Sequence, residues 1–94
     1  PSGQGQRSFL IAEKKVARMP TLLLLNGFKF FFYANDHPPA HVHVLKGERW
    51  AKIEVVSLAV KYSTLKNQEL KECLSIVESH QSEFLEKWNA WFQR

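Results

Sequence analysis

Three of the four histidines in this chain, His37, His41 and His43, lie within seven residues of one another. Histidine changes charge near neutral pH, and its neutral imidazole is also a common metal ligand. Asp36 comes directly before the first of them, and a proline pair separates the first histidine from the other two. So many ionisable groups beside a stiff turn indicate a site rather than scattered surface residues.

The spacing of the last two histidines indicates how they point. Side chains alternate between the two faces of a strand, so His41 and His43 share one face while Val42 and Val44 share the other. Same-face neighbours on a strand lie about 6.6 Å apart, which allows two imidazoles to reach one ligand. We therefore expect the imidazoles to converge on a single solvent-accessible spot.

Metal binding is one chemistry that fits this cluster. Neutral imidazoles bind Zn²⁺ and similar divalent transition metals, so His37, His41 and His43 form a candidate three-ligand site with an open position. Asp36 is expected either to complete the site or to orient an imidazole from outside it. The chain has no cysteine pair and no His-Glu-x-x-His motif that would indicate another metal site.

Metal-free catalysis is a second chemistry. A neutral and a protonated histidine can act as base and acid, which makes His41 and His43 candidates for cleaving an RNA phosphodiester as a ribonuclease-like hydrolase or transferase. Asp36 or His37 would orient them. Three basic residues that follow the cluster are candidates to bind the phosphate: Lys46, Arg49 and Lys52.

A third interpretation is a binding surface without catalysis. Three aromatic residues close to the cluster, Phe31, Tyr33 and Trp50, would then stack on nucleic-acid bases, although aromatics near a sheet are more often buried. A purely structural interpretation also stands, in which the histidines belong to a rigid turn and to half-exposed strand positions.

The chain between residues 21 and 62 carries the pattern of a β-sheet. Asn26-Gly27 is the strongest short hairpin signal, because a type I′ turn needs positive φ at both central residues. Alternation between apolar and polar residues is clearest from Trp50 to Val56. The predicted strands are Thr21–Leu25, Phe28–Ala34, His41–Leu45, Arg49–Val56 and a short fifth strand within Ser57–Tyr62.

The end of the chain has helical periodicity. Asn67 is a good N-cap, and apolar residues recur afterwards at intervals of three and four. We expect one long helix, or two that meet near residues 80–82, with Trp88 and Trp91 as core anchors. The predicted fold class is α+β, with an antiparallel sheet of four to five strands packed against this long C-terminal helix or pair of helices.

The 94 residues suit a single domain. We assign it to residues 19–94, and we expect residues 1–18 to be an N-terminal extension that is poorly ordered or foreign to the natural protein. The net charge of +4 comes largely from that extension, which has four of the 13 basic residues and one of the nine acidic ones. Cys73 is the single cysteine, which excludes an internal disulfide and fits a reducing cytoplasm. No apolar run is long enough for a membrane span.

Residues 19–92 resemble the bacterial family DUF4160, a domain of unknown function. The resemblance rests on the start at Met19, on the segment Gly27–Tyr33, on the block Asn35–Val44 with its His-Pro-Pro-x-His-Val-His motif, and on the end of the late helix. It implies a small cytoplasmic bacterial protein that works with another small protein, in an arrangement similar to a toxin–antitoxin pair. The family implies no reaction.

Together these observations predict one component of a toxin–antitoxin-like pair with histidine-based ribonuclease activity. The alternatives are a non-enzymatic partner-binding protein and a histidine-cluster metal-binding protein. The expected partners are a small protein encoded nearby and RNA, with a homo-oligomer left open.

Overall fold

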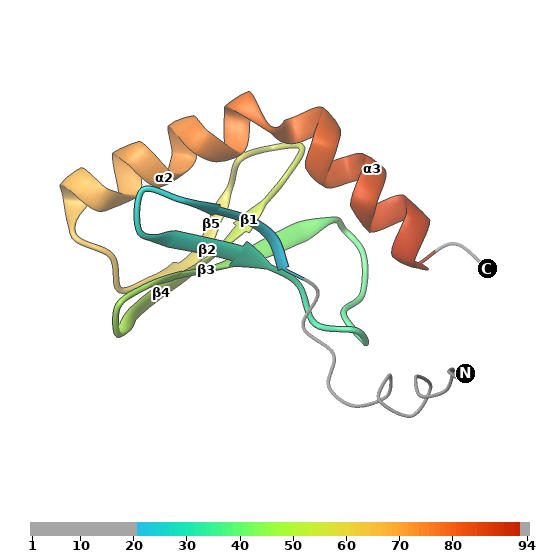
Figure 1. Cartoon of the computed structure of the whole chain (residues 1–94), viewed down its shortest axis with the longest axis horizontal. Helices are drawn as coiled ribbons and strands as arrows, with labels where there is room; N and C mark the ends of the chain where they lie inside the picture. The colour runs from blue at the N-terminus through green and yellow to red at the C-terminus, as the bar shows by residue number, and fades with distance from the viewer. Residues whose placement is uncertain (1–20, 93–94) are drawn as a thin grey trace, which may run out of the picture.

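A computed structural model of the protein describes residues 21–92, and the extension predicted for residues 1–18 lies outside them. The described chain forms a five-stranded antiparallel sheet followed by two helices, which is the predicted α+β class (Figure 1). The strands follow one another in space in the order of the sequence. The elements are β1 (Thr21–Leu25), β2 (Phe28–Phe31), β3 (His41–Lys46), β4 (Arg49–Glu54), β5 (Val60–Ser63), α2 (Asn67–Ser79) and α3 (Gln81–Phe92).

Tight turns join β1 to β2 and β3 to β4. Asn26 and Gly27 have φ values of 52° and 83°, as a type I′ turn requires, so the predicted β1–β2 hairpin is confirmed. Gly47, with a φ of 62°, serves the turn between β3 and β4. In that second hairpin His43 lies opposite Lys52, and Lys46 lies opposite Arg49 at the far end.

The helices cover one face of the sheet, and the core lies between them. Figure 1 shows α2 and α3 running in sequence across the same face. Alternation along β3 sends Val42 and Val44 into this core, while His41 and His43 point to the face without helices. The core contains Leu22, Phe28, Phe30, Phe32, Val42, Val44, Ala51, Ile53, Val55, Leu65, Cys73, Ile76, Val77, Phe84 and Trp88.

A break at His80 divides the helical region into two, which was one of the two predicted arrangements. The His80 ring donates from Nδ1 to the carbonyl of Ile76 at 2.9 Å and stacks on Phe84. Gln81 then donates to the carbonyl of Val55 at 2.7 Å, which fastens the junction to the end of β4. None of the helices within residues 21–92 is long and apolar enough to cross a membrane.

Several element boundaries differ from the prediction. β2 ends at Phe31 rather than at residue 34, because the Tyr33 backbone N–H bonds to the Asp36 side chain instead of a neighbouring strand. β4 ends at Glu54 and β5 begins at Val60, since residues 54–58 turn with Leu58 at a φ of 64°. The helix that was expected to be capped by residue 67 begins there instead.

Three residues of the helices were predicted to be buried in the core, and the structure confirms this for two of them. Cys73 is fully buried, and burial raises the pKa of its thiol to about 12, so it behaves as a small apolar core residue. Trp88 is buried as predicted. The prediction that Trp91 is a core anchor is wrong. Its side chain is partly exposed, and its indole N–H donates to the carbonyl of Ala34 at 3.3 Å.

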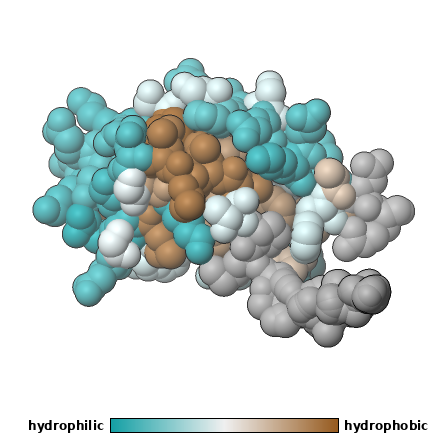
Figure 2. Space-filling view, viewed as in Figure 1, coloured by the Kyte–Doolittle hydropathy of each residue, from teal (hydrophilic) through white to brown (hydrophobic). Residues whose placement is uncertain are grey.

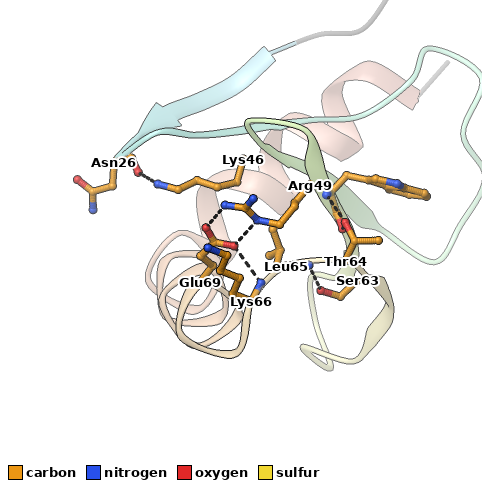
Figure 3. Close-up of polar contacts among 9 residues, drawn as sticks. Asn26, Lys46, Arg49, Ser63, Thr64, Leu65, Lys66 and Glu69 are labelled. Carbon is orange, nitrogen blue, oxygen red and sulfur yellow. Dashed lines mark hydrogen bonds and ion pairs between the residues drawn. The ribbon is translucent and has the colours of Figure 1, made fainter.

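The start of α2 is tied to the sheet by an ion pair (Figure 3). Arg49 binds Glu69 through two nitrogens, with its Nε at 2.8 Å from Oε1 and its Nη2 on Oε2. The same Oε1 accepts the backbone N–H of Lys66 at 2.9 Å, at the helix N-terminus. These interactions, with the hydrogen bond from Arg49 first, lower the pKa of Glu69 to about 2.

This depressed pKa predicts a pH-dependent contribution to stability. Glu69 is ionised in the folded protein well below its ordinary pKa of about 4.3, so its contribution is complete above that pH and is lost as the pH falls toward about 2. We expect Glu69→Gln to remove this dependence. In urea unfolding between about pH 2 and 4.5, the difference in unfolding free energy between parent and variant should shrink with acidification. Glu86→Gln, an exposed carboxylate on α3, is the control, and an equal trend there would contradict the prediction.

Candidate functional site

A turn between β2 and β3 positions the carboxylate of Asp36. The Tyr33 backbone N–H donates to Asp36 Oδ2 at 2.8 Å, and the Asp36 backbone N–H donates back to the Tyr33 carbonyl at 3.1 Å. Asp and Asn favour such turns because their side chains bond to nearby backbone, and Asn35 precedes Asp36 here. The turn holds Oδ2 in front of the first residues of β3.

Both strand histidines point at this one oxygen. His43 Nε2 lies 3.1 Å from Asp36 Oδ2, and His41 Nε2 lies 3.3 Å from the same atom. The centroids of the two imidazole rings are 5.1 Å apart. The three residues each offer one ligand atom, and these atoms all lie within 4.8 Å of one another.

The protonation of His41 follows from its other nitrogen. Nδ1 lies 2.9 Å from the carbonyl oxygen of Pro39, which can only accept, so Nδ1 carries a proton. In the neutral ring Nε2 then carries a lone pair, and this lone pair is directed toward the carboxylate of Asp36. This Nε2 is buried and has no hydrogen-bond partner, although Asp36 lies within ion-pair distance of it. A buried polar atom without a partner is rare and costly.

Aromatic residues fix the orientation of both rings. His41 is 4% exposed and packs against Trp88 of α3, with ring centroids 5.1 Å apart. His43 is 9% exposed and lies between Phe31, stacked at 5.5 Å, and Tyr33, edge-on at 4.6 Å. Both imidazole side chains are therefore buried, and they converge on one spot.

His43 is held in its neutral form. Burial is the largest influence and lowers its pKa, while the charge of Asp36 and the hydrogen bond to it act in the opposite direction. Electrostatic interaction with His41, when that ring is protonated, and with Lys52 lowers the pKa further. Since the net shift is below 6.5, His43 is predominantly an uncharged imidazole at neutral pH, which is the form that binds metals.

Solvent reaches the cluster through an open cleft of about 440 Å³. Lys52 from β4 and Lys61 from β5 stand on its wall, and Lys61 Nζ lies 3.7 Å from Glu54 Oε2. A ligand in the cleft would thus meet both the cluster and two lysines. The cleft is lined by Asn35, Asp36, His37, Pro38, Pro39, His41, Lys52, Glu54 and Lys61.

The structure brings together only part of the predicted site. His37 is exposed at the cleft, and the third group beside the two strand histidines is Asp36 instead. Lys46 and Arg49 sit at the opposite end of the hairpin, about 17 Å along the strand from its first residue. Figure 3 shows them bound elsewhere, to the backbone of Asn26 and to the carboxylate on α2. Of the candidate phosphate ligands, Lys52 alone lines the cleft.

Sequence reasoning missed three residues of the site. Lys61 and Glu54 line the cleft, and Trp88 packs on the buried histidine from a helix more than forty residues away. Strand pairing could have identified Glu54, because it lies opposite His41 in the β3–β4 register. Lys61 enters the cleft where the β4–β5 register shifts, which alternation along the strand does not reveal.

Residues 27–89 match the family model described as a domain of unknown function (DUF4160). The match covers most of the chain and confirms the resemblance inferred from the His-Pro-Pro-x-His-Val-His block. No curated protein and no solved structure matches the chain.

The convergence on Asp36 predicts a clear stability effect. Asp36→Ala leaves the Tyr33 N–H and the His43 Nε2–H without their acceptor, so in metal-free protein we expect the unfolding free energy to fall by about 1–3 kcal/mol. Urea unfolding in the presence of a chelator measures this. Asn35→Ala, at the exposed neighbouring position, should change stability by less than about 0.5 kcal/mol. Equal losses in the two variants would show that Asp36 is not the centre of the turn.

Proposed function

Because the chain belongs to the DUF4160 family of unknown function, its activity has to be inferred from its own site, and we propose that it binds a divalent transition metal such as Zn²⁺ through Asp36, His41 and His43. The observation that carries this proposal is the buried Nε2 of His41, a lone pair aimed at a carboxylate. A bound cation satisfies both groups at once, because each donates electrons to it.

The distances support a shared ion. Zinc bonds of about 2.0–2.2 Å place neighbouring ligand atoms roughly 3 to 3.5 Å apart. Asp36 Oδ2 lies 3.1 Å and 3.3 Å from the two Nε2 atoms, and all three ligand atoms lie within 4.8 Å of one another. The Nδ1 bond from His41 to Pro39 resembles the outer-shell bonds that orient metal-binding imidazoles.

The ligand types are those of known catalytic metal sites. Two histidines and one carboxylate leave positions open in zinc hydrolases and in non-haem iron enzymes. A metal bound in this way supplies Lewis-acid chemistry or an activated water. The protein's contribution is an open cleft on one side of the cluster and buried aromatic packing on the other.

The geometry gives less support to metal-free proton transfer by His41 and His43. One nitrogen of His41 donates to Pro39 and the other faces Asp36, so neither is directed at a substrate. The predicted ribonuclease chemistry is therefore better served by a metal at this cluster than by two histidines acting alone.

Metal analysis of the untagged protein tests the proposal. After equilibration with Zn²⁺ and removal of free metal, we expect close to one ion per chain. His41→Ala and Asp36→Ala should each weaken binding by more than the roughly 10- to 100-fold that loss of an outer-shell partner costs. His37→Ala is the matched control, because this histidine lies on the same loop, outside the three-residue cluster. Absence of metal, or equal loss in the control, would refute the proposal.

A second candidate function is the predicted pairing with another small protein, and β1 favours it. Among the described strands β1 lies at one edge of the sheet, and its sequence has neither charge nor proline to discourage an added strand. Leu24 is 68% exposed. Figure 2 shows a hydrophobic patch on the side of the molecule where β1 crosses the view. We propose that a strand of a partner pairs with β1, as one half of a toxin–antitoxin-like pair.

Co-purification with the product of the adjacent reading frame tests this pairing. Leu24→Lys should abolish the complex while leaving the fold intact, because the side chain is already exposed. Val56→Lys is the control, since Val56 is equally exposed but lies beyond the end of β4. A complex that survives Leu24→Lys, or that is lost in both variants, would contradict the role of β1.

A further inference from the structure

We propose that the sheet face without helices binds single-stranded nucleic acid, with a base in an aromatic groove and the neighbouring phosphate in the lysine-lined cleft. This inference goes beyond metal binding and does not require a bound metal. It rests on exposed aromatic rings, on the charges around them and on the way two cavities meet at the histidine pair.

The groove is a hollow of about 250 Å³ on this face. Tyr33 and Trp50 form part of its wall and remain 41% and 40% exposed. Trp50 also stacks on Tyr62 of the edge strand β5, at a centroid distance of 4.4 Å. Exposed rings that are already stacked and held by a sheet resemble the platforms on which proteins stack single-stranded bases. The groove is lined by Phe31, Tyr33, His43, Val44, Leu45 and Trp50.

Positive charge surrounds these rings. Lys29 lies over the Phe31 ring at 5.6 Å, and Lys52 and Lys61 line the cleft. Two carboxylates also line the cleft: Glu54 pairs with Lys61, and Asp36 faces the two strand histidines. Among residues 21–92 no carboxylate lies within ion-pair distance of Lys52, so its ammonium group is available to a phosphate. These lysines would not help to bind an apolar protein partner, whereas they would attract the negatively charged phosphates of a nucleic acid.

The two cavities adjoin. His41 lines the cleft and His43 lines the groove, and these residues are one same-face step apart on β3, or about 6.6 Å. Lys52 lies opposite His43 in the register of the sheet and also lines the cleft. A base on Tyr33 and Trp50 would therefore bring its own phosphate beside Lys52 and next to the metal-binding cluster. Only an unpaired strand exposes its base faces for such stacking.

Fluorescence anisotropy tests the proposal, with labelled oligouridine and oligothymidine of about ten nucleotides and a duplex of the same length. All measurements are made with a chelator present, so a failure of metal binding leaves the result unaffected. We expect single strands to bind with a dissociation constant of about 10⁻⁴ to 10⁻⁶ M at physiological salt, and the duplex to bind more weakly.

The variants separate stacking from charge. Trp50→Ala should weaken binding about 5- to 100-fold, while Trp50→Phe, which retains a ring, should recover most of it. Lys52→Gln should weaken binding of both oligonucleotides alike and reduce the slope of log K against log salt by about one. Lys71→Gln, an exposed lysine on α2, is the control and should match the parent. Circular dichroism shows whether each variant is folded.

Each outcome decides a point. Binding of oligouridine alone identifies RNA as the ligand, and binding of both single strands identifies nucleic acid of either sugar. No binding, tighter binding of the duplex, or equal affinities for the Trp50→Ala, Lys52→Gln and Lys71→Gln variants would overturn the proposal. In the last case the ligand would occupy another surface.

Discussion

The site depends on one carboxylate oxygen. Asp36 Oδ2 accepts a backbone N–H from its own turn, faces Nε2 of His43 at 3.1 Å and faces Nε2 of His41 at 3.3 Å. When the His41 ring is neutral, this nitrogen and the carboxylate oxygen are both electron-rich, and the turn and the aromatic packing hold them side by side. The Pro39 carbonyl keeps the proton on Nδ1 of His41, so the conflict cannot be relieved by a change of tautomer. A cation at this point relieves it.

The rest of the fold keeps these groups together. Alternation along β3 places its valines in the core beneath α2 and α3, and the same alternation turns His41 and His43 to the other face. Because the core is well filled, the strand cannot rotate to expose the histidines without exposing apolar side chains. Trp88 links the two layers, since it packs in the core and also against His41. The helices thus contribute to the site without supplying a ligand.

Features with a short period or a strong local preference could be predicted from the sequence. The Asn26-Gly27 turn, the shared face of His41 and His43, and the apolar face of the helices all follow from local rules. Features that depend on tertiary contacts could not. Arg49 was expected to bind a phosphate but is taken by Glu69 of α2, a contact that exists only once the helix docks. The choice of Asp36 over His37 depends on backbone angles within the proline turn, which the pattern of residue types does not determine.

The most direct test follows each imidazole nitrogen as zinc is added. In long-range proton–nitrogen correlation spectra of histidine-labelled protein, the central claim predicts that Zn²⁺ shifts Nε2 of His41 and Nε2 of His43. Nδ1 of His41 should remain protonated and bonded to Pro39, and the exposed His37 should not change. Zinc that shifts His37 instead, or that leaves every ring nitrogen unchanged, would contradict the claim.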